Sequence, residues 1–242
     1  MTKALEAHLR RQIEHSQRFF WQRLRWRAVR TYLPADSMFT VVDVGAGAGL
    51  LGDFLARDRP IATYEFVEPI TSLRKSLRER FGVEADAADR SDFGDASFVT
   101  LLDVLEHQED DRAFLEDLVG KMQTGSTLLL TVPALQSLWS DWDVALGHFR
   151  RYDKNSLRKC AADLPLKISE LSFLFPEMVP LGMARAHRTS TNSGAEVSGD
   201  AEFPNLPRLL NDVLYGIGSA SLALRHRWRT GTSLFLVATV TE

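Results

Sequence analysis

The segment 39–52 constrains the fold of this chain more than any other. It reads Phe-Thr-Val-Val-Asp-Val-Gly-Ala-Gly-Ala-Gly-Leu-Leu-Gly, a β-branched and aromatic run followed by alternating glycines. The run predicts a buried strand, and the glycines predict a tight turn whose backbone a ligand can approach because it lacks Cβ atoms. Residues 50–57 then predict a helix, whose first N–H groups face the turn and favour negative charge. Together these elements indicate a nucleotide-type cofactor site.

Two acidic residues bear on which cofactor this is. The spacing Gly47-x-Gly49-x-x-Gly52 formally matches the dinucleotide fingerprint. However, Asp43 comes two residues before the first glycine, where it would repel a pyrophosphate and could meet an ammonium group. Glu68 follows the next apolar run and is expected within reach of ribose hydroxyls. Both acids favour S-adenosylmethionine over NAD, and a glycine turn needed only for packing is the structural alternative.

Three motifs of the chain resemble those of the class I S-adenosylmethionine-dependent methyltransferases. They are Val-Asp-Val-Gly-Ala-Gly-Ala-Gly (42–49), Val-Glu-Pro (67–69) and Leu-Leu-Asp-Val-Leu-Glu-His (101–107). The likeness is closest to the small-molecule branch often called the type 11 or type 12 methyltransferases. It covers roughly residues 10–242 and is strongest over 39–152. It implies S-adenosylmethionine as the cofactor and a Rossmann-like three-layer α/β fold, with a seven-stranded, mostly parallel sheet whose last strand is antiparallel.

Alternating strand and helix patterns agree with a parallel sheet covered by helices on both faces. Strands are expected at 39–44, 61–67, 83–86, 97–103, 127–132, 166–173 and 233–241. Helices are expected at 50–57, 71–80 and 110–123, with a helical excursion at 205–224 that Gly216 and Gly218 break. A chain of 242 residues can build one large core but is too short for two ordinary enzyme domains.

We divide this single domain into four segments. Residues 1–33 form an N-terminal helical segment, 34–188 the core, 189–204 a mobile loop, and 205–242 the helical excursion and the last strand. The first segment has apolar residues at helical spacing and many arginines, which predicts either a docking helix that covers the cofactor or a cationic helix on an anionic membrane. The apolar, proline-broken segment 171–183 could cover the core, line an acceptor pocket or touch a bilayer.

The resemblance extends the cofactor site beyond the glycine turn. It implies that Asp86 contacts the adenine, with Ala87 adding a backbone contact, although Asp86 could be one loop acid among several. Asp103 and Val104 end a strand at the sheet edge where ligands bind in such folds. The expected cofactor-binding residues are Asp43, Gly45, Ala46, Gly47, Gly49, Glu68, Pro69, Asp86, Ala87, Asp103 and Val104.

A polar and aromatic cluster after the strand 127–132 is the candidate acceptor site. Trp139 and Trp142 could form apolar walls, and Arg150 and Arg151 could hold a carboxylate or phosphate through their planar guanidinium groups. The alternative is a charged surface loop that its tryptophans anchor to the core.

His148 is the expected catalytic base, because an imidazole can take a proton from a hydroxyl or amine near neutral pH. Tyr152 and His107 are the further catalytic candidates, although His107 could equally cap a helix or pack. No metal is expected, because Glu106, His107, Asp141 and His148 are individually suitable ligands with unspecific spacing.

These observations predict a methyltransferase acting on a small-molecule or lipid-linked acceptor, with oxygen as the favoured atom. The net charge of −3 implies no general attraction to nucleic acid, and the single Cys160 excludes an internal disulfide and a cysteine metal cluster. No apolar run is long enough to cross a membrane, so we expect a cytoplasmic enzyme. No obligate protein partner is evident, and peripheral membrane contact stays open. The alternatives are an NAD-dependent oxidoreductase and a catalytically silent S-adenosylmethionine-binding interaction protein.

Overall fold

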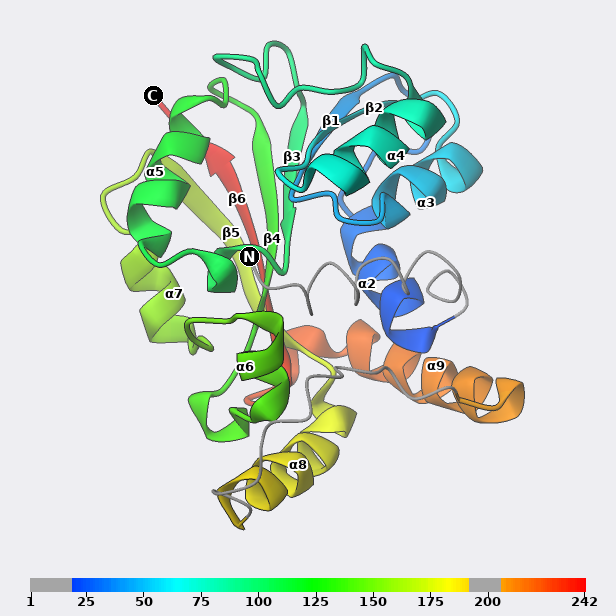
Figure 1. Ribbon diagram of the computed structural model, residues 1–242, viewed down its shortest axis with the longest axis vertical. Coiled ribbons are helices and arrows are strands. Elements are labelled where there is room, and N and C mark those ends of the chain that lie inside the picture. The colour runs from blue at the N-terminus through cyan, green and yellow to red at the C-terminus, as the bar shows by residue number, and fades with distance from the viewer. Residues whose placement is uncertain (1–18, 192–205) are drawn as a thin grey trace.

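A computed structural model describes residues 19–191 and 206–242 and shows one sheet between layers of helices (Figure 1). The sheet has six strands in the order β2-β1-β3-β4-β6-β5. The strands are β1 (Thr40–Val44), β2 (Thr63–Val67), β3 (Phe98–Leu102), β4 (Thr127–Pro133), β5 (Leu166–Leu174) and β6 (Ser233–Val240). The α-helices are α2 (Phe20–Arg30), α3 (Leu50–Asp58), α4 (Thr71–Phe81), α5 (Asp111–Gly120), α6 (Asp141–Leu146), α7 (Lys154–Cys160), α8 (Val179–Thr191) and α9 (Arg208–Ala223).

The sheet is mostly parallel. Strand β1 pairs in parallel with β2 and β3, and β3 pairs in parallel with β4. The last strand, β6, runs antiparallel to both of its neighbours, β4 and β5, as expected. Parallel strands place their carboxyl ends at the same edge, so the segments that follow β1, β2, β3 and β4 meet there.

The expected strand at 83–86 is wrong, and the sheet therefore has six strands instead of seven. This segment makes only an isolated bridge between Phe66 and Asp86. The amide of Asp86 donates to the carbonyl of Val83 at 3.2 Å, so the chain is already turning where an extended ladder would have to begin. Val83 is also 67% exposed and gains little from pairing with the sheet.

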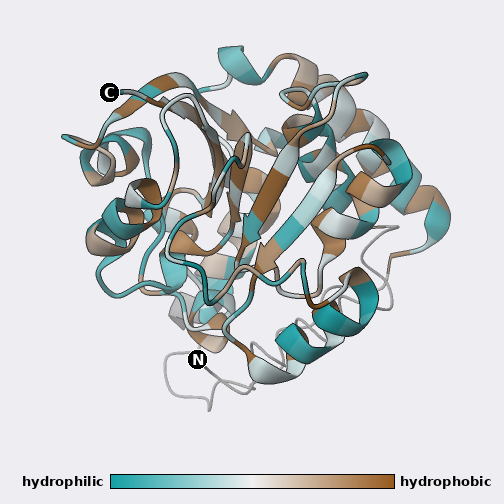
Figure 2. Cartoon of the chain, turned by 90° about the horizontal axis from the view of Figure 1, so that it is seen from above, coloured by the Kyte–Doolittle hydropathy of each residue, from teal (hydrophilic) through white to brown (hydrophobic). Residues whose placement is uncertain are grey.

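Both faces of the sheet are apolar and covered by helices. One face packs against α5 and α7, the other against α2, α3 and α9, and α4 lies beside β2. Figure 2 shows hydrophobic colouring along parts of the strands and hydrophilic colouring on many of the surrounding helices and loops. Asp43, Thr100 and Thr131 are buried polar exceptions within β1, β3 and β4, near the carboxyl edge of the sheet.

Helix α2 packs beside the sheet and against α9. Its apolar face buries Phe20, Leu24 and Val29 in the core, and the Phe20 amide donates to Asn211 Oδ1 on α9 at 2.8 Å. The sequence before residue 19 lies outside the described residues, and so does most of the expected mobile loop, 189–204. Helix α9 continues through Gly216 and Gly218, so the expected break at these glycines is wrong.

The apolar segment 171–183 divides between core and surface. Its first part completes β5, and Phe173 and Leu174 of this strand and the following Phe175 are buried, which supports core cover for that half. Its second part begins α8, where Leu181 and Met183 are exposed. Within residues 19–191 and 206–242, no helix is both long enough and apolar enough to span a bilayer.

The crossing of α2 and α9 depends on the absence of a side chain at Gly218. A Cβ there would lie 2.2 Å from Leu24 Cδ1, whereas a Cβ at Gly216 would meet open space. We expect Gly218→Ala to destabilise the fold by about 1–3 kcal/mol through overpacking, and Gly216→Ala to stabilise it by about 0.5–1 kcal/mol through helix propensity. Urea unfolding of both variants measures the change in the free energy of unfolding. Equal stabilities of the two variants would contradict the close approach of α2 and α9 at Gly218.

Candidate functional site

The glycine turn leaves the carboxyl end of β1 and returns as α3. Gly45, Gly47 and Gly49 have φ of 74°, 55° and 72°, a conformation that favours glycine at each position. The Gly45 and Ala46 amides both donate to the carbonyl of Val67, which fixes the turn beside the end of β2. The turn therefore presents backbone, with few side chains, at the ligand-binding edge of the sheet.

The segment after β3 lies directly against this turn. A Cβ on Gly45 would lie 2.5 Å from Cγ2 of Val104, so only glycine allows this approach. Asp103 has a φ of 56°, and its carboxylate accepts a hydrogen bond from Thr131 Oγ1 and forms an ion pair with Arg25 of α2. Arg25 thus ties the N-terminal helix to the same edge, a contact that the sequence analysis did not predict.

Glu68 holds the turn in place. Its two carboxylate oxygens accept hydrogen bonds from the amides of Gly47 and Ile70, each at 2.7 Å, and the residue is 3% exposed. Burial raises the pKa of Glu68 above its ordinary value. Pro69, also expected in the cofactor site, follows it and is exposed. The predicted ribose ligand is therefore also the residue that positions the glycine backbone.

Asp43 lies inside the sheet below the turn. Thr100 Oγ1 donates to Asp43 Oδ1 at 2.7 Å, and the Tyr64 hydroxyl donates to Asp43 Oδ2 at 3.1 Å. Complete burial raises the pKa of Asp43 to about 6 despite these two hydrogen bonds. Its contact with an ammonium group stays a prediction, because both carboxylate oxygens already have partners in the sheet.

Asp86 is held by two arginines of α4. Its Oδ2 accepts from Nε of Arg74 and Nε of Arg78, each at 2.5 Å, and its Oδ1 accepts from the Ala88 amide at 3.0 Å. Burial raises the pKa of Asp86, but the bonds from Arg74 and Ala88 leave it below the ordinary value. The neighbouring Ala87 donates its amide to the Phe66 carbonyl at 2.8 Å. Asp86 and Ala87 lie beside the end of β2, and their contact with adenine stays a prediction.

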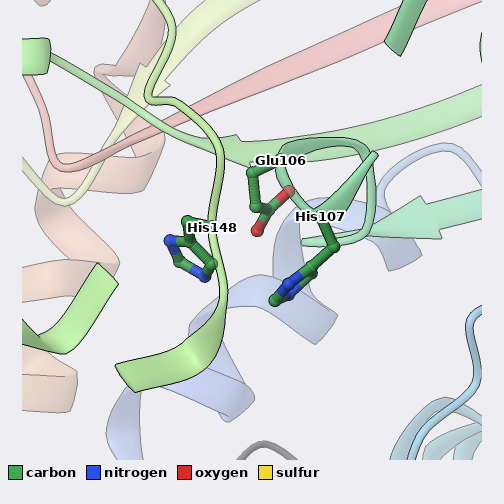
Figure 3. A group of neighbouring side chains, drawn as sticks. All are labelled: Glu106, His107 and His148. Atoms are coloured by element: carbon green, nitrogen blue, oxygen red, sulfur yellow. The ribbon is translucent and has the colours of Figure 1, made fainter. Parts of the chain in front are cut away.

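Two histidines and a glutamate meet at the predicted acceptor site (Figure 3). Glu106 and His107 belong to the short 3₁₀ helix Leu105–His107 after β3, and His148 lies on the loop after α6. The rings of His107 and His148 are 4.7 Å apart at their centroids in an edge-to-face arrangement. Glu106 is fully buried, and neither carboxylate oxygen has a hydrogen-bond partner among the described residues. Burial, followed by the charge of Asp103, raises the pKa of Glu106 well above its ordinary value.

Asp143 orients His148. Its Oδ1 lies 2.9 Å from His148 Nδ1, and its two oxygens also accept from Nε and Nη2 of Arg151 at 2.8 and 3.0 Å. Burial raises the pKa of Asp143, but the bond to His148 and the charge of Arg151 bring it below the ordinary value. An ionised carboxylate only accepts, so in the neutral form of the imidazole Nδ1 carries the proton and Nε2 holds the lone pair. The planar group of Arg151, predicted to bind substrate, is occupied by Asp143.

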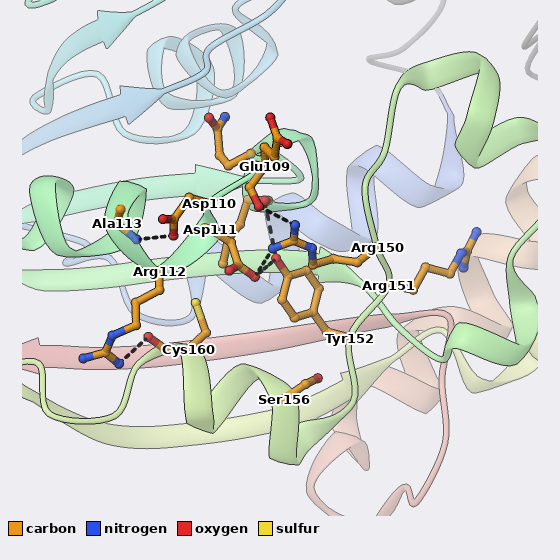
Figure 4. A network of polar contacts seen from close by, with 12 residues as sticks. Glu109, Asp110, Asp111, Arg112, Ala113, Arg150, Arg151, Tyr152, Ser156 and Cys160 are labelled. Carbon is orange, nitrogen blue, oxygen red and sulfur yellow. Dashed lines mark hydrogen bonds and ion pairs between the residues drawn. The ribbon is translucent and has the colours of Figure 1, made fainter.

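Arg150 and Tyr152 converge on Asp111 of α5 (Figure 4). Arg150 Nη1 lies 2.8 Å from Asp111 Oδ2, and the Tyr152 hydroxyl donates to the same oxygen at 2.8 Å. Tyr152 is 2% exposed, and burial together with Asp111 raises its pKa. A buried phenol with a raised pKa keeps its proton. The Tyr152 hydroxyl therefore holds the loop to Asp111 of α5, and the geometry does not support Tyr152 as a catalytic base.

The two predicted tryptophans lie on either side of the start of α6. Trp139 is half-buried and precedes the helix, and Trp142 packs against Leu146 while the Arg185 guanidinium lies 4.5 Å from its ring centroid. The contact with Arg185 joins α6 to α8, Trp142 also packs within its own helix, and the role of both tryptophans stays a prediction. The contact of Arg185 and the burial of Glu106 could not be predicted from residue spacing, because both depend on packing between distant segments.

Comparison with known proteins agrees with this geometry. Residues 7–171, more than half of the chain, match the family model described as a methyltransferase domain. The comparison with curated proteins found no match.

Several solved structures share the fold. One is a complex of the Trm112 methyltransferase activator with a methyltransferase from Haloferax volcanii. The match has 15% sequence identity and a TM-score of 0.62, and it covers 98% of this chain and 96% of the chain in that structure. Another is a SAM-dependent methyltransferase from Archaeoglobus fulgidus, at 16% identity, 90% and 93% coverage and a TM-score of 0.54. A third is coclaurine N-methyltransferase bound to N-methylheliamine and SAH, at 10% identity, 91% and 72% coverage and a TM-score of 0.55.

The burial of Asp43 predicts a specific pH dependence of stability. Its pKa rises from 3.8 to about 6 on folding, so the folded state keeps a proton that the unfolded state loses, and stability falls as pH rises through about 6. Asp43→Asn removes this charge. We expect the variant to gain stability over the parent between pH 4 and pH 7, by on the order of 2–3 kcal/mol. Urea unfolding across this range measures the gain, and a difference that does not change with pH would contradict the assignment.

Proposed function

Because the chain belongs to the class I S-adenosylmethionine-dependent methyltransferase family, we propose that it methylates an oxygen of a small-molecule or lipid-linked acceptor at the carboxyl edge of its sheet. One connected set of contacts supports this proposal. Gly45 of the turn touches Val104, the Val104 carbonyl accepts from the amide of His107, and the ring of His107 faces that of His148. The cofactor turn and the histidine pair are thus neighbours on one edge.

The residues of the turn fit S-adenosylmethionine. The glycines expose backbone at the end of β1, and the buried carboxylate of Glu68 lies where the second strand ends, which suits a ligand with ribose hydroxyls. When bound, the cofactor supplies a methyl group on a sulfonium, which is already activated for transfer. The protein then has to align the acceptor, exclude water and accept a proton from the acceptor.

We propose that His148 accepts the proton that the acceptor loses. The bond between its Nδ1 and Asp143 leaves Nε2 as the atom with a lone pair, and its side chain is 8% exposed. Tyr152 is less suited, since its hydroxyl is buried on Asp111. Arg150 and Arg151 are bound to Asp111 and Asp143, so a substrate contact from either would require it to leave its carboxylate.

A protein partner is a separate part of the proposal. The sequence predicted no obligate protein partner, whereas one similar structure is a complex with the Trm112 activator, which bears on that prediction. An activator-like protein is therefore the partner class to examine first, by comparing turnover of the purified chain alone and with such a protein.

The cofactor assignment is tested by Glu68→Ala. Loss of a carboxylate that accepts ribose hydroxyls should weaken binding of S-adenosylmethionine and S-adenosylhomocysteine together, by roughly ten- to a hundredfold. Isothermal titration measures both ligands, with NAD as the competing cofactor and the exposed Glu79→Ala as the control. Binding of NAD in place of S-adenosylmethionine, or weakening of only one ligand, would overturn the assignment.

The acceptor assignment is tested by His148→Ala. Release of S-adenosylhomocysteine, measured over a panel of hydroxyl and amine acceptors, should fall by about 10²–10⁴-fold with the best acceptor, while S-adenosylmethionine affinity stays at the parental value. The exposed His226→Ala is the matched control. A folded His148→Ala variant with parental turnover would move the proton acceptor elsewhere, and a parent inactive on every acceptor would favour a catalytically silent binding protein.

A further inference from the structure

We propose that Glu106, His107 and His148 bind one divalent transition-metal ion on the acceptor side of the sheet. One nitrogen of each histidine and one carboxylate oxygen of the glutamate all lie within 4.8 Å of one another. Figure 3 shows the three side chains lying close together, two from the segment after β3 and one from the loop after α6. The sequence analysis expected no metal, and the tertiary structure brings together three of the four candidate ligands it considered.

The carboxylate of Glu106 is the strongest argument for a cation. The side chain is fully buried, and both oxygens lack a hydrogen-bond partner among the described residues. A buried polar group without a partner costs free energy, and native folds pair such groups with a donor, a water or an ion. The nearby arginines are committed elsewhere, since Arg25 pairs with Asp103 and Arg151 with Asp143. A metal ion would give the carboxylate the partner that it lacks.

His148 has the orientation of a metal ligand. A ligating histidine commonly donates its other ring N–H to a carboxylate, which fixes the tautomer and the ring plane. Asp143 takes this position at 2.9 Å from Nδ1, so Nε2 is the ligating atom. Asp143 is itself held by the guanidinium of Arg151 and by the Ser140 amide, which donates to its Oδ2 at 2.9 Å. The ring of His148 is therefore held by Asp143, and Asp143 is held in turn by Arg151 and Ser140.

The backbone joins the two segments that carry the ligands. The Phe149 amide donates to the Glu106 carbonyl at 2.8 Å, so the residue after His148 is fixed to a residue of the 3₁₀ helix. The His107 amide donates to the Val104 carbonyl at 3.1 Å, which fixes the other end of that helix. Bonds of about 2.0–2.2 Å to a common ion would draw the three ligand atoms closer together through small side-chain rotations.

Two imidazoles and one carboxylate indicate the type of ion. This donor set suits Zn²⁺, Co²⁺ or Mn²⁺, whereas Ca²⁺ and Mg²⁺ prefer sites built from oxygen. Three protein ligands leave coordination positions open, as in catalytic sites. Given the proposed function, the open positions would receive the acceptor oxygen and lower the pKa of its hydroxyl, so the acceptor class is a hydroxyl compound. With the ion bound, Nε2 of His148 would hold the metal and the proton of the acceptor would pass to solvent, so the role of His148 as proton acceptor applies to the protein without the ion.

Metal binding to the full chain tests the site. After chelator treatment and gel filtration, the parent is titrated with Co²⁺, followed by its visible spectrum, and with Zn²⁺ in competition. We expect one ion per chain, and at least tenfold weaker binding for Glu106→Gln, His107→Ala and His148→Ala. Asp143→Asn should weaken binding about 10–100-fold, since it leaves the ligands in place and removes only their support. Glu109→Gln and His226→Ala, both on exposed residues, should bind as the parent does.

The readouts separate this proposal from the proposed function. Affinity for S-adenosylhomocysteine reports folding of each variant, and it should not change in the four site variants. If a variant loses that affinity, an NMR titration of the parent chain with Zn²⁺ tests the site instead. Zn²⁺ should shift the signals of the His107 and His148 rings and leave the signal of His226 unchanged. Parental metal binding in folded Glu106→Gln and His148→Ala, or no Co²⁺ binding by the parent, overturns the metal site and leaves the methyltransferase proposal intact. Metal binding without methyl transfer to any acceptor overturns the function and leaves the site intact.

Discussion

The hydrogen bonds from the amides of Gly47 and Ile70 to the buried carboxylate of Glu68 are the contacts on which the cofactor edge depends. They join the turn after β1 to the end of β2. A turn of alternating glycines is conformationally free in isolation, and fixing it costs backbone entropy. The carboxylate offsets this cost because it accepts from both sides of the junction. The same residue can therefore position the backbone and face the ligand.

The acceptor side is organised in a comparable way, by one buried acid that several groups share. Asp143 binds His148 and Arg151 and caps the first turn of α6 through Ser140. Such a carboxylate stays ionised because its partners outweigh the cost of burial. Glu106 shows the opposite balance, since it is buried without a described partner. The hydrogen bond from the Phe149 amide to the Glu106 carbonyl joins the segments that carry these two acids, and the contrast between them marks where a cation would be stabilised.

Charge also links the outer helices to the site. Arg25 brings α2 onto Asp103 at the end of β3, and Arg74 and Arg78 bring α4 onto Asp86. Removing one partner of such a pair would leave an acid with a large desolvation cost. The ion pairs thus hold one helix that is distant in sequence, α2, and one that is adjacent in sequence, α4, against this edge of the sheet.

The sequence by itself determined the features that depend on local chemistry. Alternating glycines favour a left-handed turn, and apolar runs favour buried strands. Motif order along the chain placed Glu68 and Val104 at the ends of the two strands that flank β1. Tertiary structure decided the rest. It removed the strand at 83–86, committed Arg151 to Asp143, and brought Glu106 and the two histidines together. These outcomes depend on which distant side chains compete for one buried group, and residue spacing does not encode that competition.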